Sequence, residues 1–213
     1  MRDIIIIGAG GFGREVQWLI ERINTQVAGD KWNILGYIDD GIAKGTEING
    51  YKVLGDVSFL QDIDQPVHVV CAIGNSVIRQ KLVNKLIKKE NITFPNLVDP
   101  TAIISDTAAI GRGNIICAGS VISTNVTIGD FCTFDWNCTV GHDADIHNFV
   151  MAYPNVNISG FVKTGEVLEI GTGTQIIQGI QLDDNVIIGA GTVVIRDITE
   201  AGTYVGSPAR RVK

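Results

Sequence analysis

Residues 121–130 read VISTNVTIGD, in which Ile122 and Ile128 stand six positions apart and each follows a β-branched residue. The same six-residue phase continues in both directions without a break, from Val98 to Val194. Of the seventeen positions in this phase, fourteen hold Val, Ile or Leu. The three departures are Phe134, Ala152 and Thr164.

A period of six matches neither an α-helix nor an ordinary strand, whose side chains repeat about every 3.6 and about every 2 residues. It is typical of a solenoid, in which each short strand buries its apolar residue only by stacking on its neighbours. With three six-residue faces in each coil, residues eighteen positions apart lie one above another. We therefore predict a triangular parallel β-helix for the second half of the chain.

The first half of the chain shows a different pattern. Short apolar runs predict strands at residues 4–7, 33–40 and 67–73. Helices are expected after the first and third of these strands, and such an alternation predicts a parallel sheet covered by helices. Asn75 or Ser76 is the expected cap of the second helix. The expected apolar faces are Val16, Leu19, Ile20 and Ile23 in the first helix, and Ile78, Leu82 and Leu86 in the second.

The order of short motifs along the chain resembles one family. These motifs are GAGGFGREV (8–16), YIDD (37–40), AIGN (72–75), GHD (141–143) within the repeats, and GSPARRV (206–212). Together they resemble the bacterial hexapeptide-repeat sugar acetyltransferases that act on sialic acid hydroxyls or on nucleotide-linked amino sugars. The resemblance spans nearly the whole chain.

This resemblance implies a fold and an activity. We expect a Rossmann-like α/β half-domain at residues 1–95 that binds the sugar substrate, and a left-handed parallel β-helix with a tail at residues 96–213. The family resemblance also implies a homotrimer with sites between its subunits, and acetyl-CoA as the co-substrate without a metal. The expected reaction is acetylation of the amine of a nucleotide-linked amino sugar in surface-glycan biosynthesis. O-acetylation of sialic acid or a related sugar hydroxyl is the alternative.

The glycine-rich turn at residues 8–13 follows a strand and opens a helix, which is the setting of a nucleotide-binding loop. Small residues there let backbone N–H groups and the helix N-terminus approach a diphosphate. NAD is one possible ligand, but only about three main strands precede the repeats and no dehydrogenase-like residues follow. A tight turn without a ligand is the other reading. The positions that match the family's substrate site are Gly10, Gly11, Phe12, Asp39, Asp40, Gly74 and Asn75.

One of the three histidines is favoured as catalytic. His142 lies two positions after Val140, near an expected corner of the prism, and Gly160 stands one coil above it. A neutral imidazole can act as a general base, and an approachable glycine N–H can stabilise an oxyanion, which are the two requirements of acyl transfer from a thioester. Asp143 is expected to orient the ring. His68, in a buried-looking strand, is expected to be structural, and His147 to face solvent.

Coenzyme contacts are implied by the resemblance alone. The acetyl carbonyl would match Gly160, and basic residues of the tail would meet the coenzyme phosphates. A solvated tail without a ligand is the alternative for these basic residues. The positions matched to coenzyme binding are Met151, Gly160, Thr172, Ala190, Arg210 and Arg211.

Composition narrows the classes of protein. The formal charge of −6 argues against a general nucleic-acid or membrane-surface binder. The four cysteines show no zinc spacing, which suits thiols in a reducing compartment. No apolar run is long enough to span a membrane, and the N-terminus does not resemble a signal peptide. A cytoplasmic location is expected.

Two rival classes share the predicted repeat. A γ-class carbonic anhydrase has two zinc histidines five residues apart, the spacing of His142 and His147, but the position expected for its third histidine is Asp106. A non-catalytic trimeric scaffold is the second rival. Such a scaffold has no use for the phosphate-suited loop.

Overall fold

The computed structural model describes residues 1–26 and 29–213 and divides into two units, Met1–Pro100 and Thr101–Lys213. The sequence placed the boundary after residue 95, near Phe94-Pro95. The last strand of the first unit, β7 (Leu97–Val98), already carries the first residue of the repeat phase.

The first unit is built on one mainly parallel sheet with the strand order β3-β4-β2-β1-β5-β6. Its central strand β1 pairs in parallel with β2 and β5, and Ile4 to Ile7 are buried along it, as a strand covered on both faces requires. Only β3 runs antiparallel to its neighbour, β4. The strands are β1 (Arg2–Ile7), β2 (Trp32–Ile38), β3 (Glu47–Ile48), β4 (Tyr51–Gly55), β5 (Val67–Cys71) and β6 (Ile92–Thr93).

Three helices accompany this sheet: α1 (Gly11–Gln26), α2 (Val57–Asp62) and α3 (Ser76–Leu86). The prediction that Asn75 caps α3 is confirmed, because its Oδ1 accepts a hydrogen bond from the Ile78 N–H at 2.9 Å. Among the helices that the structure describes, none is long and apolar enough to cross a membrane.

The predicted apolar face of α3 is wrong in one member. Ile78 is exposed, whereas Arg79 is buried together with Leu82, Val83 and Leu86. Positions 79, 82, 83 and 86 form one helical face with i, i+3, i+4, i+7 spacing, and a charged residue in that face hid the pattern. The Arg79 guanidinium donates to the carbonyl oxygens of Ile73 and Gly74, at 2.7 and 3.2 Å.

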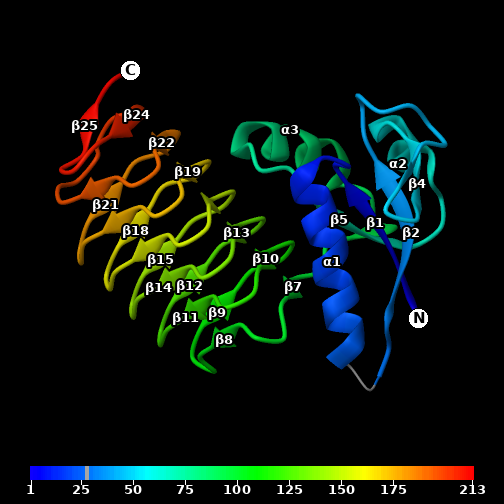
Figure 1. The fold of residues 1–213 in the computed structure, drawn as a ribbon, viewed down its shortest axis with the longest axis horizontal. Helices are drawn as coiled ribbons and strands as arrows, with labels where there is room; N and C mark the ends of the chain where they lie inside the picture. The colour runs from blue at the N-terminus through cyan, green and yellow to red at the C-terminus, as the bar shows by residue number, and fades with distance from the viewer. Residues whose placement is uncertain (27–28) are drawn as a thin grey trace. The chain divides into compact units, whose positions relative to one another are not determined.

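The second unit consists of short strands stacked in three sheets, in which the neighbouring strands are parallel except for the antiparallel pair β24 and β25 at its C-terminal end (Figure 1). All seventeen residues of the repeat phase end a strand, and partners in neighbouring coils are eighteen residues apart, as in Ile122 with Val140. The sheet orders within this unit are β23-β20-β17-β14-β11-β8, β21-β18-β15-β12-β9, and β25-β24-β22-β19-β16-β13-β10. The predicted triangular repeat is therefore confirmed.

The strands of the second unit are mostly two residues long. They are β8 (Ile103–Ile104), β9 (Ala109–Ile110), β10 (Ile115–Ile116), β11 (Val121–Ile122), β12 (Thr127–Ile128), β13 (Thr133–Phe134), β14 (Thr139–Val140), β15 (Asp145–Ile146), β16 (Met151–Ala152), β17 (Asn157–Ile158), β18 (Lys163–Thr164), β19 (Glu169–Ile170), β20 (Gln175–Ile176), β21 (Gln181–Leu182), β22 (Val186–Ile188), β23 (Val193–Val194), β24 (Gly202–Val205) and β25 (Arg210–Arg211).

Left-handed backbone conformations recur at the corners between these strands. Nine corner residues of the second unit other than glycine have positive φ, which only Asn and Asp tolerate readily. Because the coils are in register, these residues form vertical edges. They are Asn125, Phe131, Asn137, Asp143, Phe149, Asn155, Phe161, Val167 and Asn185.

Candidate functional site

His142 and Asp143 form a hydrogen-bonded pair at the corner that follows β14. The Nδ1 atom of His142 lies 2.8 Å from Oδ2 of Asp143, and the ring is 49% exposed. The hydrogen bond from His142, with a second from Asn125, lowers the pKa of the Asp143 carboxyl. A neutral ring held in this way carries its proton on Nδ1, so the lone pair of Nε2 is available as a base.

Gly160 lies against the His142 ring, as the eighteen-residue spacing predicts. A Cβ atom at residue 160 would be 2.8 Å from both Cε1 and Nε2 of the imidazole, a distance that real contacts do not show. Only glycine therefore fits without displacing the ring. The Gly160 carbonyl accepts a hydrogen bond from the Gly179 N–H at 2.9 Å.

Phe161 covers another side of the same ring. The two ring centroids are 5.0 Å apart and the planes meet at 89°, an edge-to-face contact. Phe161 has a φ of 59° and its side chain is 48% exposed. Position 161 was not predicted to belong to the site, although eighteen-residue stacking on Asp143 points directly to it.

The other two histidines lie in different environments. His68 Nδ1 lies 3.0 Å from the Asp3 carbonyl oxygen, and its ring packs edge-on against Trp32. These contacts support a structural role. His147 is exposed, and its Nε2 lies 3.7 Å from Oδ2 of Asp145. In the part of the chain that the structure describes, no three His, Cys, Asp or Glu side chains converge as metal ligands.

The glycine-rich turn has the geometry of a nucleotide-binding loop. Gly8 has a φ of +98°, and a Cβ at Gly13 would lie 1.9 Å from the Gly8 carbonyl oxygen, so the start of α1 packs closely on the end of β1. In contrast, a Cβ at Gly10 or Gly11 would meet nothing within 4 Å. No acid stands in the first turn of α1. The loop therefore leaves an open, positively polarised helix start.

Asp39 and Asp40, the two acids that follow β2, accept hydrogen bonds from backbone N–H groups. Asp39 accepts hydrogen bonds from the Ala9 and Gly41 N–H groups, both at 2.9 Å, through its two carboxylate oxygens. Asp40 accepts from the Val57 N–H at 3.0 Å. Asp39, expected to meet the substrate, thus also fixes the glycine-rich turn through its contact with Ala9.

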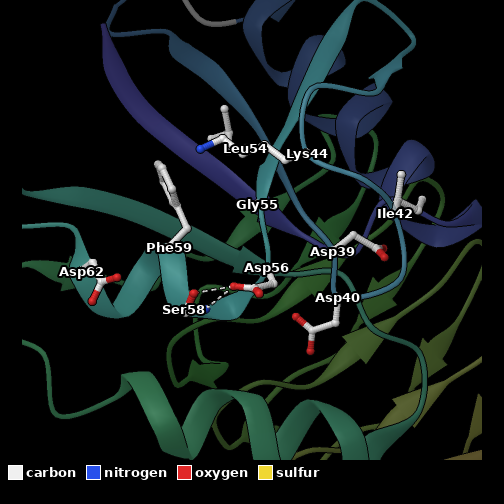
Figure 2. Close-up of a pocket in the computed structure, with 10 residues that line it drawn as sticks. All are labelled: Asp39, Asp40, Ile42, Lys44, Leu54, Gly55, Asp56, Ser58, Phe59 and Asp62. Atoms are coloured by element: carbon white, nitrogen blue, oxygen red, sulfur yellow. Dashed lines mark hydrogen bonds between the residues drawn. The ribbon is translucent and has the colours of Figure 1, made fainter.

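Two cavities adjoin these acids. The larger, of about 450 Å³, is lined by Asp39, Asp40, Lys44, Asp56 and Phe59 among others, and Figure 2 shows three of its four acids, Asp39, Asp40 and Asp56, grouped together. The smaller, of about 200 Å³, is mostly apolar. It is lined by Ile7, Gly8, Ile38, Asp39, Asp40, Val57, Ile73, Ile78 and Leu82. The exposed Ile78 thus borders the glycine-rich turn.

Gly74 and Asn75 follow β5, at the same sheet edge as that turn, but neither lines the two cavities. The Gly74 carbonyl accepts a hydrogen bond from Arg79, and the Asn75 side chain caps α3. Both residues therefore shape the loop from which Ile73 reaches the smaller cavity.

The residues expected to meet the coenzyme differ in exposure. Met151, between its strand partners Thr133 and Glu169, is only 1% exposed, and its expected contact with the coenzyme stays a prediction. Thr172 and Ala190 are exposed at successive coils of one corner.

Both arginines of the tail line a cavity of about 220 Å³. Arg211 pairs with Glu200 and donates to the Ala201 carbonyl oxygen at 2.9 Å. Arg210 donates to the carbonyl oxygen of Ala209 at 2.8 Å, and its side chain is exposed.

Comparisons with known proteins match both halves of the chain. Residues 3–86 match the family described as PglD N-terminal domain. The GDP-perosamine N-acetyltransferase of Escherichia coli O157:H7 is 32% identical over 98% of this chain and 95% of its own. The UDP-N-acetylbacillosamine N-acetyltransferase of Bacillus subtilis strain 168 is 33% identical over 55% of this chain and 52% of its own.

Solved structures resemble the chain over its full length. The acetyltransferase domain of PglB from Neisseria gonorrhoeae FA1090, in complex with acetyl coenzyme A, is 28% identical with a TM-score of 0.88, over 99% of both chains. PerB from Caulobacter crescentus, in complex with CoA and GDP-perosamine, is 26% identical with a TM-score of 0.85, over 100% of this chain and 98% of that one.

Proposed function

The chain belongs to the hexapeptide-repeat sugar acetyltransferases, and we propose that it transfers the acetyl group of acetyl-CoA to the amine of a nucleotide-linked amino sugar. Its fold is the expected one, a Rossmann-like α/β half-domain followed by a left-handed parallel β-helix. The relatives named for a GDP- or UDP-linked amino sugar support an amine as the acceptor.

His142 is the general base of this proposal. The amine of the acceptor attacks the thioester carbonyl, a C–N bond forms, and the proton of the amine passes to Nε2 of the ring. The 2.8 Å hydrogen bond between His142 Nδ1 and Asp143 is the single observation that carries the assignment, because it orients the ring and stabilises its cation. The C–S bond then breaks, and the proton on Nε2 returns to the departing thiolate.

Gly160 is the proposed site of oxyanion stabilisation. Its backbone stands beside Nε2 without a side chain, so a carbonyl oxygen can approach its N–H while the acceptor amine approaches the ring. A preorganised N–H donor at the developing oxyanion typically contributes about 10²–10³-fold to kcat.

The first unit is proposed to hold the nucleotide part of the acceptor. The open backbone at Gly10, Gly11 and Phe12 suits a diphosphate, and the first turn of α1 holds no acidic residue of its own. The adjoining cavities, bordered by Asp39 and Asp40, give the base and ribose a place beside that loop.

We place the coenzyme along the exposed corner of Thr172 and Ala190, with its phosphates near Arg210 and Arg211. Arg210 is the stronger candidate of the two arginines because Arg211 already pairs with Glu200. A homotrimer with sites between subunits and a cytoplasmic location complete the proposal. The four cysteines are buried and form no disulfide among the residues that the structure describes, which suits a reducing compartment.

A free-thiol assay with acetyl-CoA and a panel of acceptors tests this function. The panel contains GDP- and UDP-linked amino sugars, the same nucleotides without the sugar, and free sialic acid. We expect coenzyme release only with a nucleotide-linked amino sugar, and a product heavier by one acetyl group. Release with sialic acid and not with amines would replace N-acetylation by O-acetylation.

A further inference from the structure

The proposed catalytic pair, His142 and Asp143, contacts a third polar residue, Asn125, one coil below Asp143. Asn125 and Asp143 are eighteen residues apart and both have left-handed backbone, with φ of 56° and 57°. The Asn125 Nδ2 donates to Oδ1 of Asp143 at 3.2 Å, while Oδ2 of Asp143 faces His142 Nδ1 at 2.8 Å. The two carboxylate oxygens are thus divided between the two neighbours.

The two separate hydrogen bonds matter because the carboxylate of an aspartate rotates easily about its terminal torsion, χ2. The χ2 angle of Asp has broad, roughly two-fold preferences, so one hydrogen bond leaves the carboxylate free to rock. A second bond to the other oxygen fixes the carboxylate plane. Both bonds also favour the charged carboxylate, and they are the two leading causes of its lowered pKa.

Asn125 is itself held in place. Its backbone N–H donates to Oγ1 of Thr107 at 2.9 Å, and that hydroxyl lies 3.0 Å from Oγ of Ser105. Asparagine is one of the few residues that adopt left-handed backbone without a large penalty. The amide therefore starts from a fixed corner and points up the edge toward Asp143.

We propose that Asn125 is a positioning residue for the proposed acetyl transfer. Its amide fixes the plane of the Asp143 carboxylate, which keeps the proton of the neutral His142 ring on Nδ1 and leaves Nε2 as the base beside Gly160. This inference rests on the proposed function of His142, but the state of the ring can be measured without any substrate.

The first test uses two variants at position 125 and one matched control. Asn125→Gly keeps the left-handed backbone and removes the amide, and Asn125→Asp keeps the size but replaces the donor with a second negative acceptor. Asn185→Gly is the control, because Asn185 has the same left-handed backbone, with φ 57°, on a different edge. Thermal unfolding of all three separates a loss of folding from a local effect.

The first measurement is the tautomer of His142 by nitrogen-15 NMR at about pH 8.5, where an ordinary imidazole is neutral. We expect mainly the Nδ1–H form in the wild type and in Asn185→Gly. In Asn125→Gly the ratio of Nδ1–H to Nε2–H should fall about 3- to 10-fold, the range of one hydrogen bond. An unchanged tautomer ratio in Asn125→Gly would overturn the inference, whatever the turnover.

The second measurement is the split between kcat and KM. We expect Asn125→Gly to lower kcat about 3- to 10-fold with both KM values within about twofold, and Asn125→Asp to be at least as impaired. Wild-type kcat in Asn125→Asp would also overturn the inference. A tautomer shift in a protein whose wild type acetylates no acceptor would reject the proposed function and still support the role of Asn125 on the ring.

Discussion

Two edges of the β-helix share a backbone geometry and differ in chemistry. The His142 edge consists of Asn125, Asp143 and Phe161, and the aromatic edge is the part of a second edge that holds Phe131, Phe149 and Val167, below Asn185. All six residues have left-handed backbone at intervals of eighteen residues. The side chains of the aromatic edge are buried, whereas those of the His142 edge are partly or largely exposed.

The contrast shows how the same strain is offset in two ways. Left-handed backbone is costly for an aromatic or β-branched residue. On the aromatic edge, burial and ring stacking offset this cost, since the Phe131 and Phe149 centroids are 5.4 Å apart with planes 8° from parallel. Phe161 is not buried, and its ring contact is the edge-to-face packing on His142. We therefore expect the aromatic edge to contribute mainly to stability and the His142 edge to carry the proposed site.

The largest expected effect is on the stability of the aromatic edge. Phe131 is 1% exposed, so Phe131→Ala removes a buried ring and its stack on Phe149. We expect the free energy of unfolding to fall by about 3–5 kcal/mol, measured by urea denaturation. Turnover per folded molecule should change little. A large loss of turnover with unchanged stability would contradict the division between the two edges.

Gly160→Ala disturbs the His142 edge from above. The added methyl group would occupy space 2.8 Å from Nε2 and Cε1 of His142, so the ring must move and the Gly160 N–H becomes less approachable. We expect kcat to fall about 10- to 100-fold, part of the contribution of an oxyanion donor, with little change in the melting temperature. Steady-state kinetics with unaltered kcat would exclude both proposed roles of this position.

Phe161→Asn tests whether Phe161 is retained for the site. Asparagine suits the left-handed backbone, as it does at position 125, so the melting temperature should stay the same or rise slightly. The His142 ring loses its edge-to-face contact, and kcat should fall about 3- to 10-fold. If the variant is less stable and fully active, Phe161 contributes to stability, as the residues of the aromatic edge do, and not to the site.

A smaller effect is expected from Asp135, a buried acid that directly follows β13. Burial raises the pKa of its carboxyl, although the Trp136 N–H donates to it at 2.8 Å. A carboxyl whose folded pKa is raised contributes stability at low pH that is lost as the pH rises through that value.

Asp135→Asn removes this titration. Its melting temperature should exceed that of the wild type at pH 7, and the difference should shrink as the pH falls toward 4, the ordinary pKa range of aspartate. Melting curves of both proteins between about pH 4 and pH 7 measure this trend. A difference that grows on acidification has the wrong sign for a raised pKa.

The sequence predicted what depends on spacing alone. The six-residue phase predicts the strands and the stacking of Gly160 on His142. In parallel coils that stack in register, the spacing alone determines which residues are neighbours. The same rule, applied to Asp143, names Asn125 and Phe161. The prediction used this rule for His142 and not for Asp143, so these two neighbours were missed.

Properties that depend on local conformation were not predictable in this way. The Asp39 contact with Ala9 depends on the path of the glycine-rich turn, and the buried face of α3 includes Arg79, which a hydrophobic pattern cannot contain. Met151 occupies the outward position of its strand pair and is nevertheless buried. Periodicity predicts the direction in which a side chain points, but it does not predict whether other residues cover that side chain.

The most direct test of the account compares two histidines that each face a nearby aspartate. His142 lies 2.8 Å from Asp143 through Nδ1, and His147 lies 3.7 Å from Asp145 through Nε2, so only His142 has the carboxylate bond that leaves Nε2 free. The measurement is kcat of His142→Ala and His147→Ala with a nucleotide-linked amino sugar. We predict a loss of about 100-fold or more for the first and less than about threefold for the second. Equal turnover in the two variants would contradict the account.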